Sequence, residues 1–178
     1  MAKLPQKEML QGKYVNLREV AVDDAEFILK LRCDEKKSRF LHKTEYNVEK
    51  QVEYIKNYLK KDNEWYFIIE NKEHKPLGTV RIYDVEGDKY TGGSWLMIDE
   101  ATAQQVLEGD MLMKKYSFDV LGFNKNCFDV RKENKKVVRF HKICGAKIVG
   151  ENDIDYFFEL TKELYFKNRD NLLRIINK

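Results

Sequence analysis

Asn134, His141 and Gly145 are spaced along one stretch, DVRKENKKVVRFHKICGAK, as the start, middle and end of a short helix would be. Asparagine is a preferred N-cap residue and glycine a preferred C-terminal stop, so the spacing predicts a helix over residues 135–144. The ordinary pKa of histidine is about 6.5, so this imidazole can donate a proton near neutral pH. It also follows two valines on the apolar face, so a packed core histidine is the alternative interpretation.

The chain also has three cysteines, Cys33, Cys127 and Cys144. Neither their spacing nor that of the histidines matches a zinc ligand set, and none has an activating base that the sequence makes visible. Their odd number argues against a disulfide framework. Reduced, buried or half-buried thiols in a cytoplasmic protein are therefore the simplest interpretation, and we expect no metal site.

Apolar patterns predict the elements that position these residues. Alternating or short apolar runs predict strands at residues 14–20, 65–71, 77–85, 90–99, 124–132, 146–151 and 155–160. Helical spacing predicts helices at 25–32 with Asp23 as its cap, from Asn47 to about Leu59, and at 103–121, 135–144 and 162–176. A meander followed by a strand–helix–strand crossover predicts an α/β (α+β) fold, with helices on both faces of a mixed sheet.

Length and composition set limits on the kind of protein. The 178 residues, of which 43% are hydrophobic and 35% charged, predict a single globular domain over residues 1–178. The net charge of +3 is too small to predict a nucleic-acid partner. No apolar run approaches the roughly 18 residues that span a bilayer, and the N-terminus has no apolar signal core. We therefore expect neither a membrane nor a nucleic-acid partner.

Two stretches carry a resemblance to a known family. GKYVNLREVAVDDAEFILKLRCDE and SFDVLGFNKNCFDVRKENKKVVRFHKICGAKIVGE resemble the GNAT acyltransferase superfamily, and the likeness extends from about Tyr14 to Leu160. The segment LRCDEKKSRFLHKTEYNVEKQVEYI resembles the branch that acetylates nucleotide-linked amino sugars, and is also similar to enzymes that acetylate ribosomal-protein N-termini. The resemblance implies a mostly antiparallel sheet with one splayed pair of parallel strands.

The resemblance also implies where acetyl-CoA binds. Its pantetheine arm is expected between strands 94–99 and 125–131, against the backbone of Leu96, Met97 and Ile98. Its pyrophosphate is expected on backbone N–H groups at the start of the next helix, which is a general anion site. The residues at that helix start are Gln104, Gln105, Val106 and, if the loop is shifted, Gly109.

This phosphate loop departs from the family pattern Q/R-x-x-G-x-G/A. The matching stretch, AQQVLE (residues 103–108), has larger residues at both small positions, and one of them is Glu108. Glycines at those positions let backbone amides approach a phosphate closely. A carboxylate beside the pyrophosphate is unfavourable unless it points away, so the sequence predicts an altered loop.

The resemblance assigns functional roles to two residues of the helix predicted over residues 135–144. Asn134 is expected to face the pantetheine arm, and its capping role is compatible with that. His141 stands where the family usually has a tyrosine that protonates the leaving thiolate. It is expected to protonate the thiolate, to stabilise it as a cationic imidazole, to contact CoA without proton transfer, or to pack.

An attacking amine must be neutral, which requires a base or a water chain. Asp84, Glu70 and Glu86 lie on or beside the predicted meander, and Asp84 is favoured as the catalytic base. Each is also explained as a surface carboxylate. Trp95, which follows Gly92 and Gly93, is expected to wall the acceptor site or to pack in the core.

The acceptor is expected beneath the segment that holds Arg32, Arg39, His42 and Thr44. Arginines bind a diphosphate through paired N–H donors, although a solvated basic loop is the alternative interpretation. The leading hypothesis is an acetyl-CoA-dependent N-acetyltransferase that acts on the primary amine of a nucleotide-linked amino sugar. The alternatives are a protein N-terminal acetyltransferase and a non-catalytic acyl-CoA-binding domain. A small-molecule amine is the expected partner, and a homodimer is compatible with the sequence.

Overall fold

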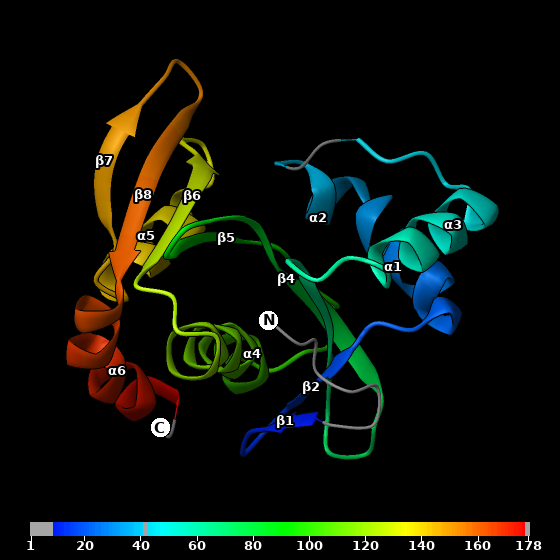
Figure 1. Ribbon diagram of the computed structural model, residues 1–178, viewed down its shortest axis with the longest axis horizontal. Coiled ribbons are helices and arrows are strands. Elements are labelled where there is room, and N and C mark those ends of the chain that lie inside the picture. Colours follow the sequence, from blue (N-terminus) through cyan, green and yellow to red (C-terminus); the bar gives the residue numbers. More distant parts are fainter. Residues whose placement is uncertain (1–8, 41–42, 177–178) are drawn as a thin grey trace.

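The structure is a computed structural model that describes residues 9–40 and 43–176. Within these residues one sheet is formed by β1 (Met9–Gln11), β2 (Asn16–Glu19), β3 (Trp65–Glu70), β4 (Pro76–Glu86), β5 (Lys89–Met97), β6 (Lys125–Arg131), β7 (Lys147–Glu151) and β8 (Asp155–Thr161). Their order is β1-β2-β3-β4-β5-β6-β8-β7, and of these neighbouring pairs only β5 and β6 are parallel (Figure 1). The predicted fold class, a mixed and mostly antiparallel sheet, is confirmed.

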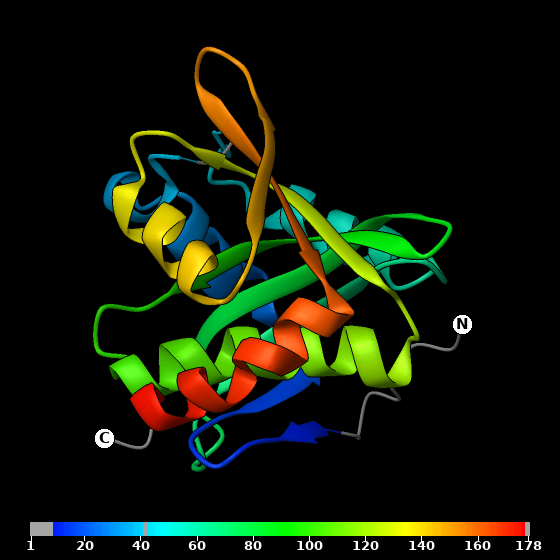
Figure 2. The ribbon, with the colours of Figure 1, turned by 90° about the vertical axis from the view of Figure 1, so that its left-hand side faces the viewer.

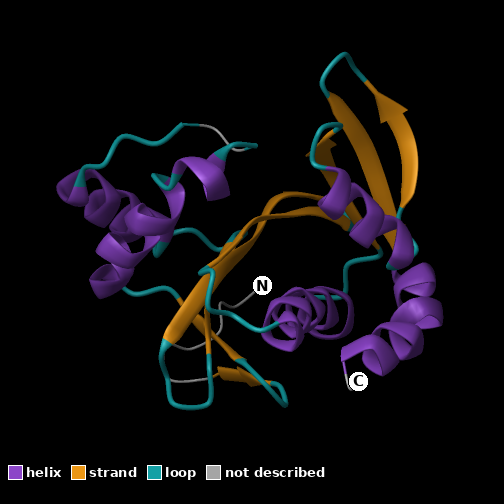
Figure 3. Cartoon of the chain, turned by 180° about the vertical axis from the view of Figure 1, so that it is seen from behind, coloured by secondary structure: helices purple, strands orange, loops and turns teal. Residues whose placement is uncertain are grey.

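Helices cover both faces of the sheet (Figures 2 and 3). They are α1 (Ala25–Arg32), α2 (Glu35–Ser38), α3 (Val48–Tyr58), α4 (Ala103–Lys115), α5 (Lys135–Ile143) and α6 (Lys162–Ile176). On one face, α1 and α3 pack through a cluster that includes Ile28, Ile55 and Tyr66. On the other face, Met113 of α4 packs with Phe67 in a larger cluster. None of these described helices is long and apolar enough to cross a membrane.

The central strand β3 is buried along its whole length. Its residues alternate between the two faces of the sheet, because side chains of a strand point to opposite sides with a period of two. Tyr66 and Ile68 belong to the cluster under α1 and α3, and Phe67 and Ile69 to the cluster under α4. Burial on both faces explains why the sequence of this strand is an almost uninterrupted apolar run.

The sequence patterns miss or misplace a few short features. They do not predict β1 or α2, which are only 3 and 4 residues long. The helix predicted over residues 103–121 ends as an α-helix at Lys115 and continues as a π-helical turn at Tyr116–Val120. Gly122 follows with φ +77°, the left-handed conformation expected of the residue that ends a helix.

The first helix has the predicted bounds but a different cap. A short 3-10 turn precedes α1, and Asp24, rather than the predicted Asp23, stands at the cap position. The carboxylate of Asp24 accepts hydrogen bonds from the backbone N–H of Ala21 and from two nitrogens of the Arg18 guanidinium, each at 2.8 Å. These contacts fix the turn from β2 into α1 and explain why Asp24 is buried.

Candidate active site

β5 and β6 pair over a short length and then separate. Their parallel register has two partner pairs, Lys89 with Lys125 and Tyr90 with Asn126. Beyond that point the buried Asn126 side chain replaces the backbone acceptor of the ladder. Its Oδ1 accepts a hydrogen bond from Gly92 N–H at 2.9 Å. A Cβ at Gly92 would lie 2.9 Å from Met113 Cε and 3.2 Å from the Asn126 amide nitrogen. Gly92 therefore leaves the room in which this side chain bridges the two strands.

A bulge at Ser94 sets the direction of the β5 backbone along the open gap. The register with β4 shifts between the pairs Thr79–Leu96 and Arg81–Gly93, and Ser94 has φ +49°. The hydroxyl of Thr79 donates to the Ser94 carbonyl at 2.8 Å, which holds this strained residue. The bulge lies one residue after the glycine pair Gly92–Gly93.

Backbone amides next to the bulge point into the gap. Ile98 N–H donates to Leu77 O of β4 at 2.8 Å, and Ile98 O accepts from Ala101 N at 3.3 Å. The Ile98 N–H is thus engaged within the fold, and the predicted contact of the Ile98 backbone with CoA stays a prediction. N–H groups alternate in direction along a strand, so the amides of Met97 and Trp95 face the open side toward β6.

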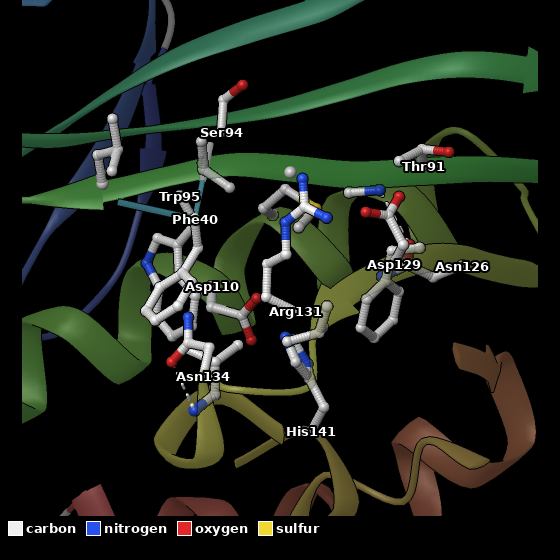
Figure 4. Close-up of a pocket in the computed structure, with 18 of the residues that line it drawn as sticks. Phe40, Thr91, Ser94, Trp95, Asp110, Asn126, Asp129, Arg131, Asn134 and His141 are labelled. Atoms are coloured by element: carbon white, nitrogen blue, oxygen red, sulfur yellow. Dashed lines mark hydrogen bonds between the residues drawn. The ribbon is translucent and has the colours of Figure 1, made fainter. Parts of the chain in front are cut away.

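A cavity of about 260 Å³ occupies the gap between the separated strands. Its walls come from β4, β5, β6, α4, α5, α2 and the segment after α2 (Figure 4). The lining includes predicted site residues, namely Trp95, Leu96, Asn134 and His141. It also includes residues that the sequence analysis does not identify, namely Lys37, Phe40, Tyr83, Thr91, Asp110, Asn126, Phe128, Asp129 and Arg131.

The helix that carries His141 is built as its sequence predicts. The side chain of Asn134 accepts a hydrogen bond from Val137 N–H at 3.4 Å at the start of α5. At its end, Gly145 has φ +93°, Gly145 N–H donates to Lys142 O, and Ala146 N–H donates to His141 O, both at 3.0 Å. This pair of bonds is the Schellman motif, in which glycine accepts the left-handed conformation without strain.

His141 is buried between aromatic rings, with only 8% of its surface exposed. Its ring centre lies 4.4 Å from that of Phe128 and 5.2 Å from that of Phe140. Burial, and secondarily the nearby Lys114 ammonium, lowers the pKa of His141 well below its ordinary value. The shift favours the neutral imidazole, and the role of His141 toward the thiolate stays a prediction.

Two nitrogens in the cavity wall lack protein partners. His141 Nδ1 and Trp95 Nε1 are buried and have no hydrogen-bond partner within the described part of the chain. The ring of Trp95 packs against that of Phe140 in a tilted arrangement, with ring centres 5.2 Å apart. Buried polar groups are nearly always paired in folded proteins. Two orphaned nitrogens beside one cavity, next to open backbone amides, fit a site that receives a polar ligand.

Asp110 and Lys114 form an ion pair below the cavity. Lys114 Nζ lies 2.5 Å from Asp110 Oδ2, and their side chains are 1% and 4% exposed. The pair comes one turn apart on α4, and its ammonium also lies 5.3 Å from the centre of the Phe140 ring. Because Asp110 is neutralised by Lys114, it is a poor candidate for the base that activates an amine.

Of the amides predicted at the start of α4, Gln104 stays available and Ala103 joins it. Thr102 caps the helix, accepting from Gln105 N–H through its side chain at 3.3 Å and from Val106 N–H through its carbonyl at 3.0 Å. The backbone amides of Gln105 and Val106 are thus occupied. Those of Ala103 and Gln104 precede the first intrahelical bond and are the ones available to an anion.

Gly109, the other residue predicted to hold the phosphate, has a packing role in the structure. Gly109 is buried in the helix interior, and a Cβ there would lie 2.8 Å from Ile69 Cδ1. The glycine lets α4 approach β3 closely. It therefore does not compensate for the missing glycines of the loop.

Glu108 points away from the helix start. Its carboxylate accepts hydrogen bonds from the backbone N–H groups of Lys13, Tyr14 and Val15 at 2.8, 2.6 and 2.8 Å. It thus anchors the segment that enters β2 on the flank of α4. The unfavourable contact between a carboxylate and a pyrophosphate is avoided, and the unusual residue has a structural explanation.

The structure does not bring the predicted base to the cavity. Asp84 is exposed and does not line it. Glu70 is held by Arg18 at 2.9 Å, and Glu86 by Lys89 at 2.8 Å. These carboxylates therefore do not support the base hypothesis. Asp129 of β6 is the exposed carboxylate of the lining, and its position opposite the glycine pair gives no signal in the sequence.

The predicted acceptor residues divide between two places. Arg32 lies in a second pocket under α1 and α3 with Thr44, rather than in the strand gap. Arg39 is exposed at the rim, 3.5 Å from Glu133. His42 lies outside the described residues, so its role stays a prediction. Trp95 lines the main cavity, which is compatible with its predicted place in the wall of the acceptor site.

Comparison with known proteins identifies the family. The model of the acetyltransferase (GNAT) domain matches residues 15–147. The chain belongs to the GNAT acetyltransferase family. By this membership it is an acetyl-CoA-dependent N-acetyltransferase, and the hypothesis of a non-catalytic domain is set aside. No curated protein matches the chain.

Solved structures agree with the GNAT assignment. The chain is 32% identical to FdhC, described in its apo form as a nucleotide-linked sugar GNAT, with a TM-score of 0.85 over 95% of this chain and 98% of that one. A GCN5-related N-acetyltransferase from Brucella melitensis is 18% identical, with a TM-score of 0.75 over 94% and 86% of the two chains. Spermidine N-acetyltransferase from Vibrio cholerae, in complex with CoA and spermine, is 16% identical, with a TM-score of 0.78 over 87% and 99%. The last two show the fold alone.

Proposed function

We propose that this GNAT enzyme transfers the acetyl group of acetyl-CoA to the primary amine of a nucleotide-linked amino sugar. The observation that carries the proposal is the gap between β5 and β6, with its bulge at Ser94 and its orphaned donors, in a chain 32% identical to a nucleotide-linked sugar GNAT along nearly its whole length. The charge distribution on the acceptor side supports the same substrate class.

The proposed pose of acetyl-CoA follows the open backbone donors. The pantetheine arm lies in the strand gap, where the amides of Trp95 and Met97 face β6. The pyrophosphate lies on the amides of Ala103 and Gln104, at the positive end of α4. Asn134 lines the same cavity and borders the arm from the start of α5.

The reaction is direct transfer. The neutral amine attacks the thioester carbonyl carbon, so a C–N bond forms and the carbonyl electron pair moves to oxygen. A β5 amide near the Ser94 bulge donates a hydrogen bond to that oxygen. When the C–S bond breaks, the sulfur leaves with the electron pair and takes up a proton, while the amine nitrogen loses one.

His141 contributes as a neutral hydrogen-bond donor rather than as an imidazolium. A neutral imidazole still has one N–H group, which can stabilise the departing sulfur. Among the carboxylates of the cavity, Asp129 remains available because Asp110 is paired with Lys114. We assign Asp129 to bind the acceptor ammonium and take up its proton, directly or through water.

The acceptor side favours an anionic substrate over a polyamine. Its carboxylates are largely committed to lysines and arginines, since Lys37 lies 2.6 Å from Asp99 and 3.3 Å from Asp34, and Arg81 lies 3.1 Å from Glu64. Arg32, in contrast, has no ion pair within the described residues. A polycation would meet few unpaired carboxylates here, whereas a phosphate would meet an unpaired arginine.

A panel of amines, followed by the release of CoA, tests the proposed function. It should contain a nucleotide-linked amino sugar, the same sugar without the nucleotide, spermidine and a short peptide with a free N-terminus. We expect the highest kcat/KM for the nucleotide-linked sugar. Preference for the peptide would support the protein N-terminal alternative, and preference for spermidine would also contradict the proposal.

A further inference from the structure

A second pocket lies on the α1 and α3 face of the sheet, outside the strand gap. It has a volume of about 230 Å³ and is lined by Arg32, Thr44, Gln51, Tyr54, Tyr66 and Arg81. These residues come from α1, α3, β3, β4 and the segment before α3. No carboxylate is among them, so the polar lining consists of guanidinium, amide and hydroxyl groups.

The two arginines of this pocket have unused donors. Arg32 Nε donates to Thr44 Oγ1 at 2.9 Å, and no carboxylate in the described residues pairs with Arg32. Arg81 Nη2 lies 3.1 Å from Glu64, but its Nε is buried without a partner. Arg18 provides the contrast, since its guanidinium is fully committed to Asp24 and Glu70.

The remaining polar groups also suit an oxygen-rich anion. Gln51 is only 8% exposed, and no hydrogen bond holds its side-chain amide within the described part of the chain. Burial raises the pKa of Tyr66 to about 12, although Arg81 and Arg32 oppose the rise. Its hydroxyl is therefore protonated and able to donate. Tyr54, 39% exposed, borders the opening and offers an aromatic face.

The second pocket adjoins the strand gap through one pair of side chains. The guanidinium carbon of Arg81 lies 5.0 Å from the ring centre of Tyr83, and Tyr83 lines the main cavity. The tyrosine hydroxyl reaches β5, because a Cβ at Gly93 would lie 2.6 Å from it. A ligand that spans both spaces would pass along Tyr83.

We propose that the pocket formed by Arg32 and Arg81 holds the diphosphate of the acceptor, and that the sugar extends past Tyr83 to the Ser94 bulge. The nucleobase of the acceptor then lies at the rim of the pocket, beside Tyr54. The identity of the ligand in this inference rests on the proposed function. The pocket itself requires only that its ligand carry a pair of phosphoryl groups. Two partly unpaired guanidinium groups with no lining carboxylate match that chemistry.

Calorimetry with inorganic pyrophosphate tests the pocket without relying on the acceptor. The protein is first saturated with CoA, so that the amides at the start of α4 are occupied. We expect pyrophosphate to bind the CoA-saturated wild type, and Arg32→Gln to weaken that binding about tenfold or more, as the loss of a charge-assisted hydrogen bond predicts. Arg81→Lys should weaken it as well, and Arg174→Gln on the exposed side of α6 should not.

Folding is monitored by the thermal midpoint of each variant, because Arg81 also holds Glu64. Arg32 has no ion pair among residues 9–40 and 43–176, so Arg32→Gln keeps the test valid if Arg81→Lys is unstable. Pyrophosphate that no longer binds once CoA is present, or that binds Arg32→Gln as tightly as wild type, would overturn the inference. An intact pocket in a protein that does not acetylate nucleotide-linked sugars would instead overturn the proposed function alone.

Discussion

Asn126 Oδ1 accepts a hydrogen bond from Gly92 N–H at 2.9 Å, at the point where β5 and β6 separate. A side-chain amide thus replaces the backbone carbonyl that a continuous parallel ladder would supply. The strands part without leaving the first amide of the gap unpaired. The width of the cavity therefore depends on one residue that is 1% exposed.

Replacing Asn126 by valine should damage both stability and cofactor binding. The Gly92 N–H loses its acceptor, and we expect the free energy of unfolding to fall by about 1–3 kcal/mol. Acetyl-CoA should bind more weakly because the strands are no longer held apart. Urea unfolding and calorimetry measure the two effects. Normal acetyl-CoA affinity in a destabilised variant would separate Asn126 from the cofactor site.

Proline at the first position of α4 tests the proposed phosphate site. Ala103→Pro removes one N–H group at a position where helices tolerate proline, so stability should hardly change. We expect acetyl-CoA affinity to fall about tenfold, which is the contribution of one charge-assisted hydrogen bond. Acetylpantetheine lacks the pyrophosphate and serves as the control ligand. An equal loss of affinity for both ligands would argue against a phosphate on this amide.

Glu108→Ala separates folding from cofactor binding. The variant leaves three backbone N–H groups without their acceptor, and we expect a loss of about 2–4 kcal/mol in the free energy of unfolding. Acetyl-CoA affinity should stay within about twofold. The matched variant Glu100→Gln, at an exposed position before the helix cap, should leave stability unchanged and bind acetyl-CoA at least as tightly. Much tighter binding by Glu108→Ala would place this carboxylate beside the phosphates after all.

The contacts of Glu108 show which structural features local sequence patterns do not predict. Periodicity and capping residues predict nearly every helix and strand, including α5 between Asn134 and Gly145, because those signals are local. Glu108 contacts a turn more than ninety residues earlier, and no local pattern reports such a pairing. The same limit applies to Asp129 and Arg81, because strand order decides which cavity each of them lines.

Among the site residues, too, those set by local signals are predicted and those set by long-range contacts are not. His141 and Asn134 are found from spacing on one helix, and both line the cavity. The phosphate-loop residues are misplaced by a turn or less, because the cap at Thr102 decides which amides remain available. Asp84 fails as a base because a strand position fixes its face only once the register is known.

The pH dependence of stability should reveal the buried, neutral His141. Its folded-state pKa lies below the ordinary value, so the unfolded chain takes up the proton first as the pH falls below about 6.5. This stabilising contribution is present above that pH and is lost below it, by up to about 1.4 kcal/mol per pH unit. Urea unfolding from pH 7.5 to 5 should show a shallower loss in His141→Phe than in wild type. Parallel curves would contradict a depressed pKa.

The most direct test of the central claim is the ratio of kcat/KM for a nucleotide-linked amino sugar to that for the same amino sugar without its nucleotide. The product is identified by mass as an N-acetylated sugar. The proposed function predicts a clear preference for the nucleotide-linked form, which comes from its lower KM. This preference should be lost in Arg32→Gln. Equal kcat/KM for the two sugars, or transfer to neither, would contradict it.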